Sequence, residues 1–240
     1  MIRITGLTKS FDRLPVFRDL SLEIRRHRVT ALLGPSGCGK TTLLNLLSGT
    51  LEPDGGTVEG VEGKRISYLF QEPRLLPWKT VEQNLDLVLK AVTRREERKE
   101  LIFRTLAAVG LAEFAHYYPE ALSGGMRQRA AMARAFAYPG EILLMDEPFQ
   151  ALDLGRKISL VRDFEGLWRD DRRTGIFVTH DVHEALMLGD CIIVFSHRPA
   201  TVVDSMENPV PHEERSLKHE AILNLEKKVY RALLQGKGDH

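Results

Sequence analysis

The sequence of 240 residues has only two cysteines, Cys38 and Cys191, and a formal net charge of only +1. With so few cysteines, one of them inside a glycine-rich loop, a scaffold held by disulfides is excluded. The near-neutral charge excludes a general nucleic-acid binder. No apolar run approaches the roughly 18 residues that a membrane span needs, and the first residues, MIRITGLTKSF, lack the apolar centre of a secretory signal. We therefore expect a globular protein that stays in the cytoplasm.

The sequence does contain short apolar runs rich in branched residues, each followed by polar or turn residues. Hydrophobic residues make up 43% of the chain and charged residues 28%, a composition typical of a soluble globular domain with a sizeable core. Such runs predict the buried strands of a mostly parallel sheet. The runs lie at 29–33, 66–70, 142–145, 176–178 and 192–195.

Three further segments alternate apolar and polar side chains, and two others have a helical pattern. Residues 2–7, 20–24 and 57–61 alternate, with the turn sequence EPDGG before the third, and predict a small antiparallel sheet. Residues 80–138 contain good helix formers and no convincing strand, so we expect an inserted α-helical subdomain. The tail from about residue 211 suits one or two amphipathic helices.

The strongest motif is a glycine-rich loop, GPSGCGKTT, which matches G-x-x-x-x-G-K-[ST] at every fixed position. It follows a predicted strand and opens a predicted helix, whereas a plain glycine-rich turn, the alternative, needs no such context. Glycines let backbone N–H groups face phosphates, the lysine reaches the β and γ phosphates, and the threonine hydroxyl of Thr41 holds Mg²⁺. The expected nucleotide-binding residues are Gly34, Pro35, Ser36, Gly37, Cys38, Gly39, Lys40, Thr41 and Thr42.

A predicted buried strand ends in two carboxylates, in the sequence ILLMDEP. Buried carboxylates lose their hydration and are costly unless they meet a cation. Asp146 is placed to hold Mg²⁺, directly or through water. Glu147 points elsewhere, and it can orient and deprotonate the water that attacks the γ phosphate. The alternative, an acidic turn that caps the next helix, is disfavoured by the phosphate loop in the same chain.

Two single polar residues follow predicted strands: Gln71 follows ISYLF, and His180 follows IFVT. The carboxyl ends of parallel strands converge on a ligand, so each side chain is a candidate site residue. Taken alone, a glutamine or histidine at such a place is usually an ordinary hydrogen-bonded polar residue.

A second anion cradle is predicted in the sequence ALSGGMRQRAAMARAF. Ser123 is a good N-cap, and Gly124 and Gly125 let a ligand approach the backbone. The helix should end near Pro139. The alternative, a capped surface helix, would not require both glycines.

The ordered series of motifs resembles the ATP-binding cassette family, and the resemblance covers nearly the whole chain. It implies an α/β fold with a P-loop NTPase core of the RecA type, and ATP and Mg²⁺ as ligands. It implies that Gln71 binds Mg²⁺, takes part in catalysis and links the nucleotide to a membrane partner, and that His180 contacts the γ phosphate. Phe11 falls where the family has an aromatic that stacks on adenine, although a core role stays open. Asp153, in ALD, joins the nucleotide site.

By the same resemblance, Ser123, Gly124 and Gly125 face the γ phosphate of an ATP held by the phosphate loop of a second copy. Two chains then sandwich two nucleotides, and one cassette per chain makes a homodimer the simplest assembly. We expect one domain, 1–240, with a nucleotide-binding core and β subdomain at 1–78 and 139–210, the helical signature subdomain at 79–138 and a helical tail at 211–240.

A second resemblance concerns function. The sequences FQEPRLLPWKTVEQNL and DEPFQALD are similar to those of bacterial importer ATPases for nitrate, sulfonate and taurine. This implies ATP hydrolysis that drives uptake of a small solute through separate permease subunits, with a solute-binding protein as an indirect partner. The chain would lie at the cytoplasmic face of the membrane as a peripheral protein, with no nucleic-acid partner. Residues 75–78, LLPW, suit either a groove for a short permease helix or the core.

Two other functions stay open. A soluble cassette acting on a non-membrane partner would usually carry a long coiled-coil insertion or a second cassette, and the sequence has neither. A nucleotide sensor without turnover is disfavoured because Glu147 and His180 fill both catalytic positions.

Overall fold

The computed structural model describes residues 1–149, 154–168, 171 and 173–236, and the chain forms two compact units. We call Met1–Lys64, Leu144–Glu147 and Arg173–His240 the core unit, and Arg65–Leu143 with Pro148–Arg172 the helical unit. In the described ranges, no helix is long and apolar enough to cross a membrane.

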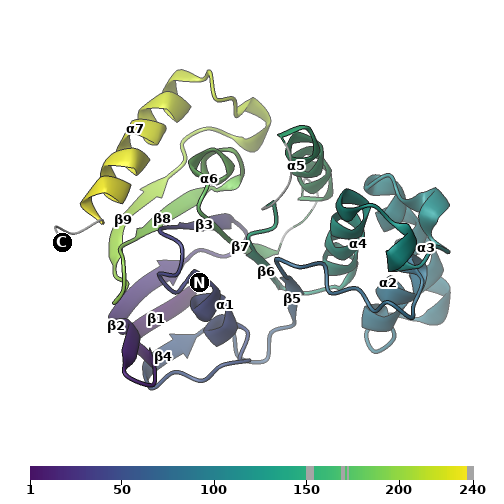
Figure 1. Cartoon of the computed structure of the whole chain (residues 1–240), viewed down its shortest axis with the longest axis horizontal. Coiled ribbons are helices and arrows are strands. Elements are labelled where there is room, and N and C mark those ends of the chain that lie inside the picture. Colours follow the sequence, from purple (N-terminus) through teal and green to yellow (C-terminus); the bar gives the residue numbers. More distant parts are fainter. Residues whose placement is uncertain (150–153, 169–170, 172, 237–240) are drawn as a thin grey trace. The chain divides into compact units, whose positions relative to one another are not determined.

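The centre of the core unit is a mostly parallel sheet (Figure 1). Its order is β6 (Ile142–Asp146), β7 (Thr174–Thr179), β3 (Val29–Leu33), β8 (Cys191–Phe195) and β9 (Val202–Glu207). β3 pairs in parallel with β7 and β8, whereas β9 runs antiparallel to β8. Every residue of β3, β7 and β8 is buried, as strands covered on both faces require. The strands predicted from apolar runs are confirmed here, and β9 is an additional strand.

The core unit also contains an antiparallel sheet, ordered β2 (Leu14–Ile24), β1 (Ile2–Phe11) and β4 (Gly55–Glu59). The prediction of a small antiparallel sheet is confirmed, but β4 begins inside the expected EPDGG turn. Gly56 has a φ of +81°, and a Cβ there would lie 2.4 Å from the backbone oxygen of Gly6. Glycine is therefore required where β4 approaches β1.

Helices of the core unit follow strands of the parallel sheet. α1 (Lys40–Leu47) comes after β3, and α6 (Val182–Leu188) comes after β7. Both helices therefore begin at the carboxyl edge of the sheet, where ligands of open α/β sheets bind. The tail forms a 3₁₀ turn (His212–Glu214) and α7 (Glu220–Gln235). α7 buries Ile222, Leu225, Val229 and Ala232.

In the described part of the helical unit there are β5 (Ile66–Leu69), beside the first residues of β6, and four α-helices. These are α2 (Val81–Leu89), α3 (Arg95–Ala108), α4 (Gly124–Ala137) and α5 (Leu154–Trp168). Between residues 80 and 138 there is no strand, as the sequence predicts, and two 3₁₀ turns lie at Ala112–Phe114 and Pro119–Ala121.

α2 of this unit begins with a side-chain cap, and three of the helices pack through apolar faces. Thr80 caps α2 in a capping box. Its hydroxyl accepts the backbone N–H of Gln83, and the side-chain oxygen of Gln83 accepts the backbone N–H of Thr80. The apolar faces of α2, α3 and α4 then pack together. Their fully buried cluster includes Val81, Leu85, Leu89, Leu106, Ala130 and Ala133.

Candidate functional site

The phosphate loop joins β3 to α1. Gly37 and Gly39 have φ values of +76° and +117°, in the region that favours glycine. At Gly39 a Cβ would lie 2.4 Å from Cγ1 of Val16, so a side chain there would clash. The loop therefore depends on glycine both for its turns and for its packing against β2.

Lys40 is 5% exposed, yet its ammonium group has hydrogen-bond acceptors. Nζ donates to the backbone oxygens of Gly34 and Pro35, each at 2.8 Å, and lies 3.9 Å from Sγ of Cys38. The charge is thus held inside the loop, where a phosphate would bind. Burial raises the pKa of the Cys38 thiol, so Cys38 stays neutral and does not neutralise the lysine.

Thr41 and Asp146 meet beside this loop. The Thr41 hydroxyl donates to Oδ1 of Asp146 at 2.9 Å, although the residues are far apart in sequence. Asp146 ends β6 and is only 7% exposed. The structure therefore brings the two predicted Mg²⁺ residues of the core unit together.

Glu147 is held in an unusual backbone conformation, with φ +44°. Its N–H donates to the backbone oxygen of Val178 at 3.1 Å, which fixes the residue against β7. Its Oε2 lies 3.2 Å from Nδ1 of His180, but this buried oxygen accepts no hydrogen bond from the residues that the structure describes. A buried carboxylate oxygen without a donor is suited to accept a hydrogen bond from a water or a ligand.

Arg198 is a residue that the sequence analysis did not identify. It lies in the loop between β8 and β9, is exposed, and its Nη2 lies 3.6 Å from the position of a Cβ on Gly37. No ion-pair partner of Arg198 occurs among the described residues. The available sequence signal was its place just after a predicted parallel strand, at the edge of the sheet where ligands bind.

The second anion cradle lies in the helical unit, at the start of α4. The Ser123 hydroxyl accepts the Met126 N–H at 3.3 Å, which confirms the predicted N-cap. Among the described residues, a Cβ on Gly124 would meet only Nη2 of Arg127, at 3.9 Å, an ordinary contact. Their packing therefore does not require glycine at position 124, as expected where a ligand from outside approaches the backbone.

The remaining candidates are more scattered. Gln71 is exposed after β5 in the helical unit. Phe11 is 48% exposed at the end of β1, so the alternative of a core aromatic is wrong. Asp153 lies outside the described residues. The core unit therefore brings together Lys40 with its loop, Thr41 with Asp146, and Glu147 with His180.

Comparison with known proteins shows the family. A protein-family model described as "ABC transporter" matches residues 17–150. The chain belongs to the ABC transporter family. The family prediction from the ordered motifs is confirmed, and so is the α/β cassette fold.

Two curated relatives of this ABC chain are similar over most of their length. The aliphatic sulfonates import ATP-binding protein SsuB 1 of Agrobacterium fabrum is 38% identical over 98% of this chain and 83% of its own. The taurine import ATP-binding protein TauB of Yersinia pestis is 38% identical over 86% of this chain and 84% of its own.

A solved structure described as the dimeric structure of MJ0796, a bacterial ABC transporter cassette, superposes with a TM-score of 0.77 and 28% identity. It covers 88% of this chain and all of the cassette. A second structure of MJ0796, with a TM-score of 0.76 and 27% identity, is a dimeric post-hydrolysis state bound to ADP and Pi. Our ABC chain therefore has an ATPase cassette fold, and ATP is its nucleotide.

Proposed function

We propose that this chain is the ATP-hydrolysing subunit of an importer for a small solute of the sulfonate, taurine or nitrate kind. Separate permease subunits would carry the solute, a solute-binding protein would act indirectly, and the chain would lie peripherally at the cytoplasmic face of the membrane. The observation that carries the hydrolytic role is the convergence of Thr41 with Asp146 and of Glu147 with His180 at one edge of the sheet. The similarity to SsuB and TauB supports the importer class.

Binding begins with charge and backbone groups of the core unit. Lys40 is already held in the loop by two backbone oxygens, and a phosphate oxygen would replace these neutral acceptors with a charged one. The loop N–H groups and the N-terminus of α1 supply further positive potential. By the family resemblance, exposed Phe11 would stack on adenine, and Asp153 would belong to the nucleotide site. These assignments together explain affinity for a nucleoside triphosphate.

The residues present fit Mg²⁺. Asp146 offers a buried carboxylate and Thr41 a hydroxyl, and no group of three or more His, Cys, Asp or Glu side chains in the described ranges could hold a metal by itself. Mg²⁺ bound together with phosphates matches this pattern, since it takes few protein carboxylates and keeps several waters. Gln71 is assigned as a further ligand. When bound, the ion would neutralise charge on the phosphates.

Glu147 is the proposed base and His180 its neighbour at the γ phosphate. The positive φ of Glu147 and its N–H bond to Val178 fix where the carboxylate points. The unsatisfied Oε2 could accept the proton of an attacking water. His180 is half exposed and 3.2 Å from that oxygen, so it can donate to a phosphate without leaving the site.

The signature helix would complete the site of a second copy. Ser123 caps α4, and Gly124 and Gly125 are its first residues. Ser123 and Gly124 are exposed and Gly125 is partly exposed. The dimeric form of the similar MJ0796 cassette supports this arrangement. Two chains would then enclose two ATP molecules and bind each other through them.

The Glu147→Gln variant should shift from monomer toward dimer when ATP is added. Because uncleaved ATP would bridge two chains, it should stabilise the associated state by mass action, whereas ADP lacks the γ phosphate that reaches the signature. Size-exclusion chromatography with ATP, ADP or no nucleotide measures the shift. Glu59→Gln removes an exposed carboxylate from β4 and is the matched control, which should hydrolyse ATP normally. Identical elution of Glu147→Gln in all three conditions would contradict an ATP-driven dimer.

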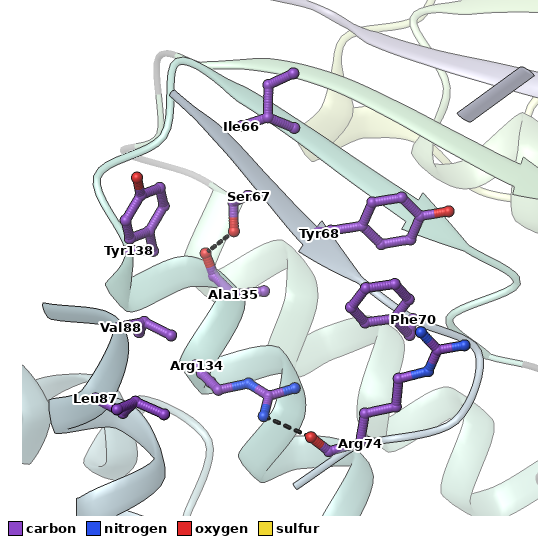
Figure 2. Close-up of a pocket in the computed structure, with 10 residues that line it drawn as sticks. All are labelled: Ile66, Ser67, Tyr68, Phe70, Arg74, Leu87, Val88, Arg134, Ala135 and Tyr138. Atoms are coloured by element: carbon purple, nitrogen blue, oxygen red, sulfur yellow. Dashed lines mark hydrogen bonds between the residues drawn. The ribbon is translucent and has the colours of Figure 1, made fainter. Parts of the chain in front are cut away.

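A pocket of about 410 Å³ in the helical unit suits a permease segment (Figure 2). Tyr68 and Phe70 stack at 4.2 Å along one wall, and the Arg74 guanidinium lies 4.1 Å from the centre of the Phe70 ring. Arg134 donates to the Arg74 backbone oxygen at 2.8 Å, which holds the segment that carries Arg74. Apolar walls with a cationic rim favour an amphipathic helix that carries an acidic residue.

This pocket differs from the groove expected at residues 75–78. Leu75 packs against the helical cluster, while Trp78 is 69% exposed, and neither lines the pocket. The lining instead comes from β5 and the loop after it, from α2, and from α4 with its C-cap residue Tyr138. Leu87, on α2, lines it and is 45% exposed, so a polar substitution there should not disturb the core.

Uptake in cells that lack this chain tests the proposal. We expect uptake of labelled taurine, an alkanesulfonate or nitrate to be lost, to return with the wild-type chain, and not to return with Glu147→Gln. Leu87→Glu should bind ATP normally yet fail to restore uptake, because a charge would disrupt permease docking. Phe103→Glu, at an apolar residue of α3 that is 66% exposed and outside the pocket, should restore it. Normal uptake of all three solutes, with recovery of the chain on ribosomes or DNA, would favour the soluble alternative.

A further inference from the structure

A buried hydroxyl and a buried carboxylate form a hydrogen-bonded pair next to His180 in the chain. Thr179 ends β7 and is 2% exposed, and Glu184 lies on α6 and is 6% exposed. The Thr179 hydroxyl accepts the Asp181 N–H at 3.0 Å and donates to Oε2 of Glu184 at 2.5 Å. Since a hydroxyl has one hydrogen, the bond to Glu184 fixes its rotation.

The residue after His180 is fixed as well. The Asp181 carboxylate accepts the N–H groups of His183 and Glu184, at 2.8 and 3.3 Å, and caps α6. The peptide after His180 is therefore held by the Thr179 hydroxyl, and the residue that follows is fixed by its cap on α6. Its own side chain, in contrast, stays about half exposed next to Glu147.

We infer that Thr179 and Glu184 are positioning residues for His180, an inference that rests on the proposed role of His180 at the γ phosphate. The bonds set the direction in which the imidazole leaves the backbone, before any nucleotide binds. Misplacement of such a group by about 1 Å costs on the order of a hundredfold in rate. A buried pair that prevents this movement gives the Glu184 carboxylate a role that offsets the cost of its burial.

Helix capping is the competing explanation for Glu184. An acidic residue in the first turn stabilises a helix through its charge. Asp181 already caps α6 with two hydrogen bonds, however, so the Glu184 carboxylate is not needed to start the helix. The two explanations predict different results for Glu184→Gln. This variant loses the charge through which an acidic residue stabilises a helix, but it keeps an oxygen that can accept the Thr179 hydrogen bond.

The experiment follows the His180 imidazole by nitrogen NMR of the nucleotide-free full chain, with His180→Gln to assign its signals. Thr179→Val, similar in shape but without the hydroxyl, should shift or broaden these signals, and Thr179→Ser and Glu184→Gln should preserve them. In the chain with ATP, Thr179→Val should lower turnover about ten- to hundredfold with ATP affinity nearly unchanged. Thr179→Ser should restore turnover.

Two outcomes separate this inference from the proposed function. If Thr179→Val lowers the melting temperature but leaves the His180 signals as in the wild type, the pair is only a cap and positioning is wrong. If Thr179→Val moves the signals while His180→Ala hydrolyses ATP normally, positioning stands and the catalytic role of His180 fails. When both are right, adding Thr179→Val to His180→Ala should lower turnover no further, because residues that act through one group are not additive.

Discussion

Glu147→Gln is expected to bind ATP as the wild type does and to lower its hydrolysis about 10²- to 10⁴-fold, the usual contribution of a general base. The amide keeps the size of the side chain but cannot take a proton from water. Glu147 is placed for this role by its φ of +44° and by the bond from its N–H to Val178. The substitution either replaces the buried, unsatisfied Oε2 with an amide nitrogen or leaves it as a neutral amide oxygen.

Lys40→Ala should give a different defect, weaker binding of ATP. Lys40 supplies the buried charge of the phosphate loop, and a hydrogen bond to a charged group is worth about 1.5–3 kcal/mol, or roughly ten- to hundredfold in affinity. Titration with a fluorescent ATP analogue measures binding, and phosphate release at saturating ATP measures turnover. Glu59→Gln serves as the control in both assays. Hydrolysis at the normal rate by Glu147→Gln would show that another group is the base.

Apolar runs predicted the parallel strands because those strands are buried on both faces. β3 and β8 are apolar or small at nearly every position, and all their residues are buried. β9 lacks this signal: in VVDSME only Met206 is buried, and its pairing with β8 alone defines it as a strand. A strand at the edge of a sheet needs little apolar sequence, so its presence depends on tertiary pairing.

β1 and β2 were predicted too short for a different reason, whereas β4 was predicted at its full length but two residues too late. β2 begins at Leu14, although its regular alternation begins only at Leu20. Asp19 has a φ of +55°, and the pairing of β1 with β2 shifts register near Leu7. Such irregularities break the two-residue period on which strand prediction from sequence depends.

The candidate site was predictable where chemistry fixes the spacing of residues. Loop residues up to Lys40 and the two carboxylates at the end of β6 follow motifs in which neighbours act together. Arg198 carries no such motif, because its approach to Gly37 depends on the pairing of β8 with β3. Thr179 and Glu184 are five residues apart, but their bond depends on the turn between β7 and α6 and has no distinctive composition.

A mixed dimer of a Lys40→Ala chain with a Ser123→Arg chain should recover nucleotide trapping at one site, although neither parent homodimer traps. If the signature acts on the second copy, one composite site receives both defects. The other site combines the intact Lys40 of one chain with the intact Ser123 of its partner. Ser123 is exposed at the start of α4, so arginine there would obstruct an approaching nucleotide more than it would disturb the fold.

The opposite assignment gives a different result. If Ser123 served the phosphate loop of its own chain, every site in the mixed dimer would carry one defect and none could recover. Vanadate-dependent trapping of labelled ATP in differently tagged, purified heterodimers is the measurement, since steady-state turnover could need both sites. Ser216→Arg, at an exposed serine of the core unit, controls for the added charge and size and should trap normally as a homodimer. Trapping in the mixed dimer should reach about half the wild-type amount, one site of two. Trapping no greater than in the parents would show that the signature does not act across the dimer.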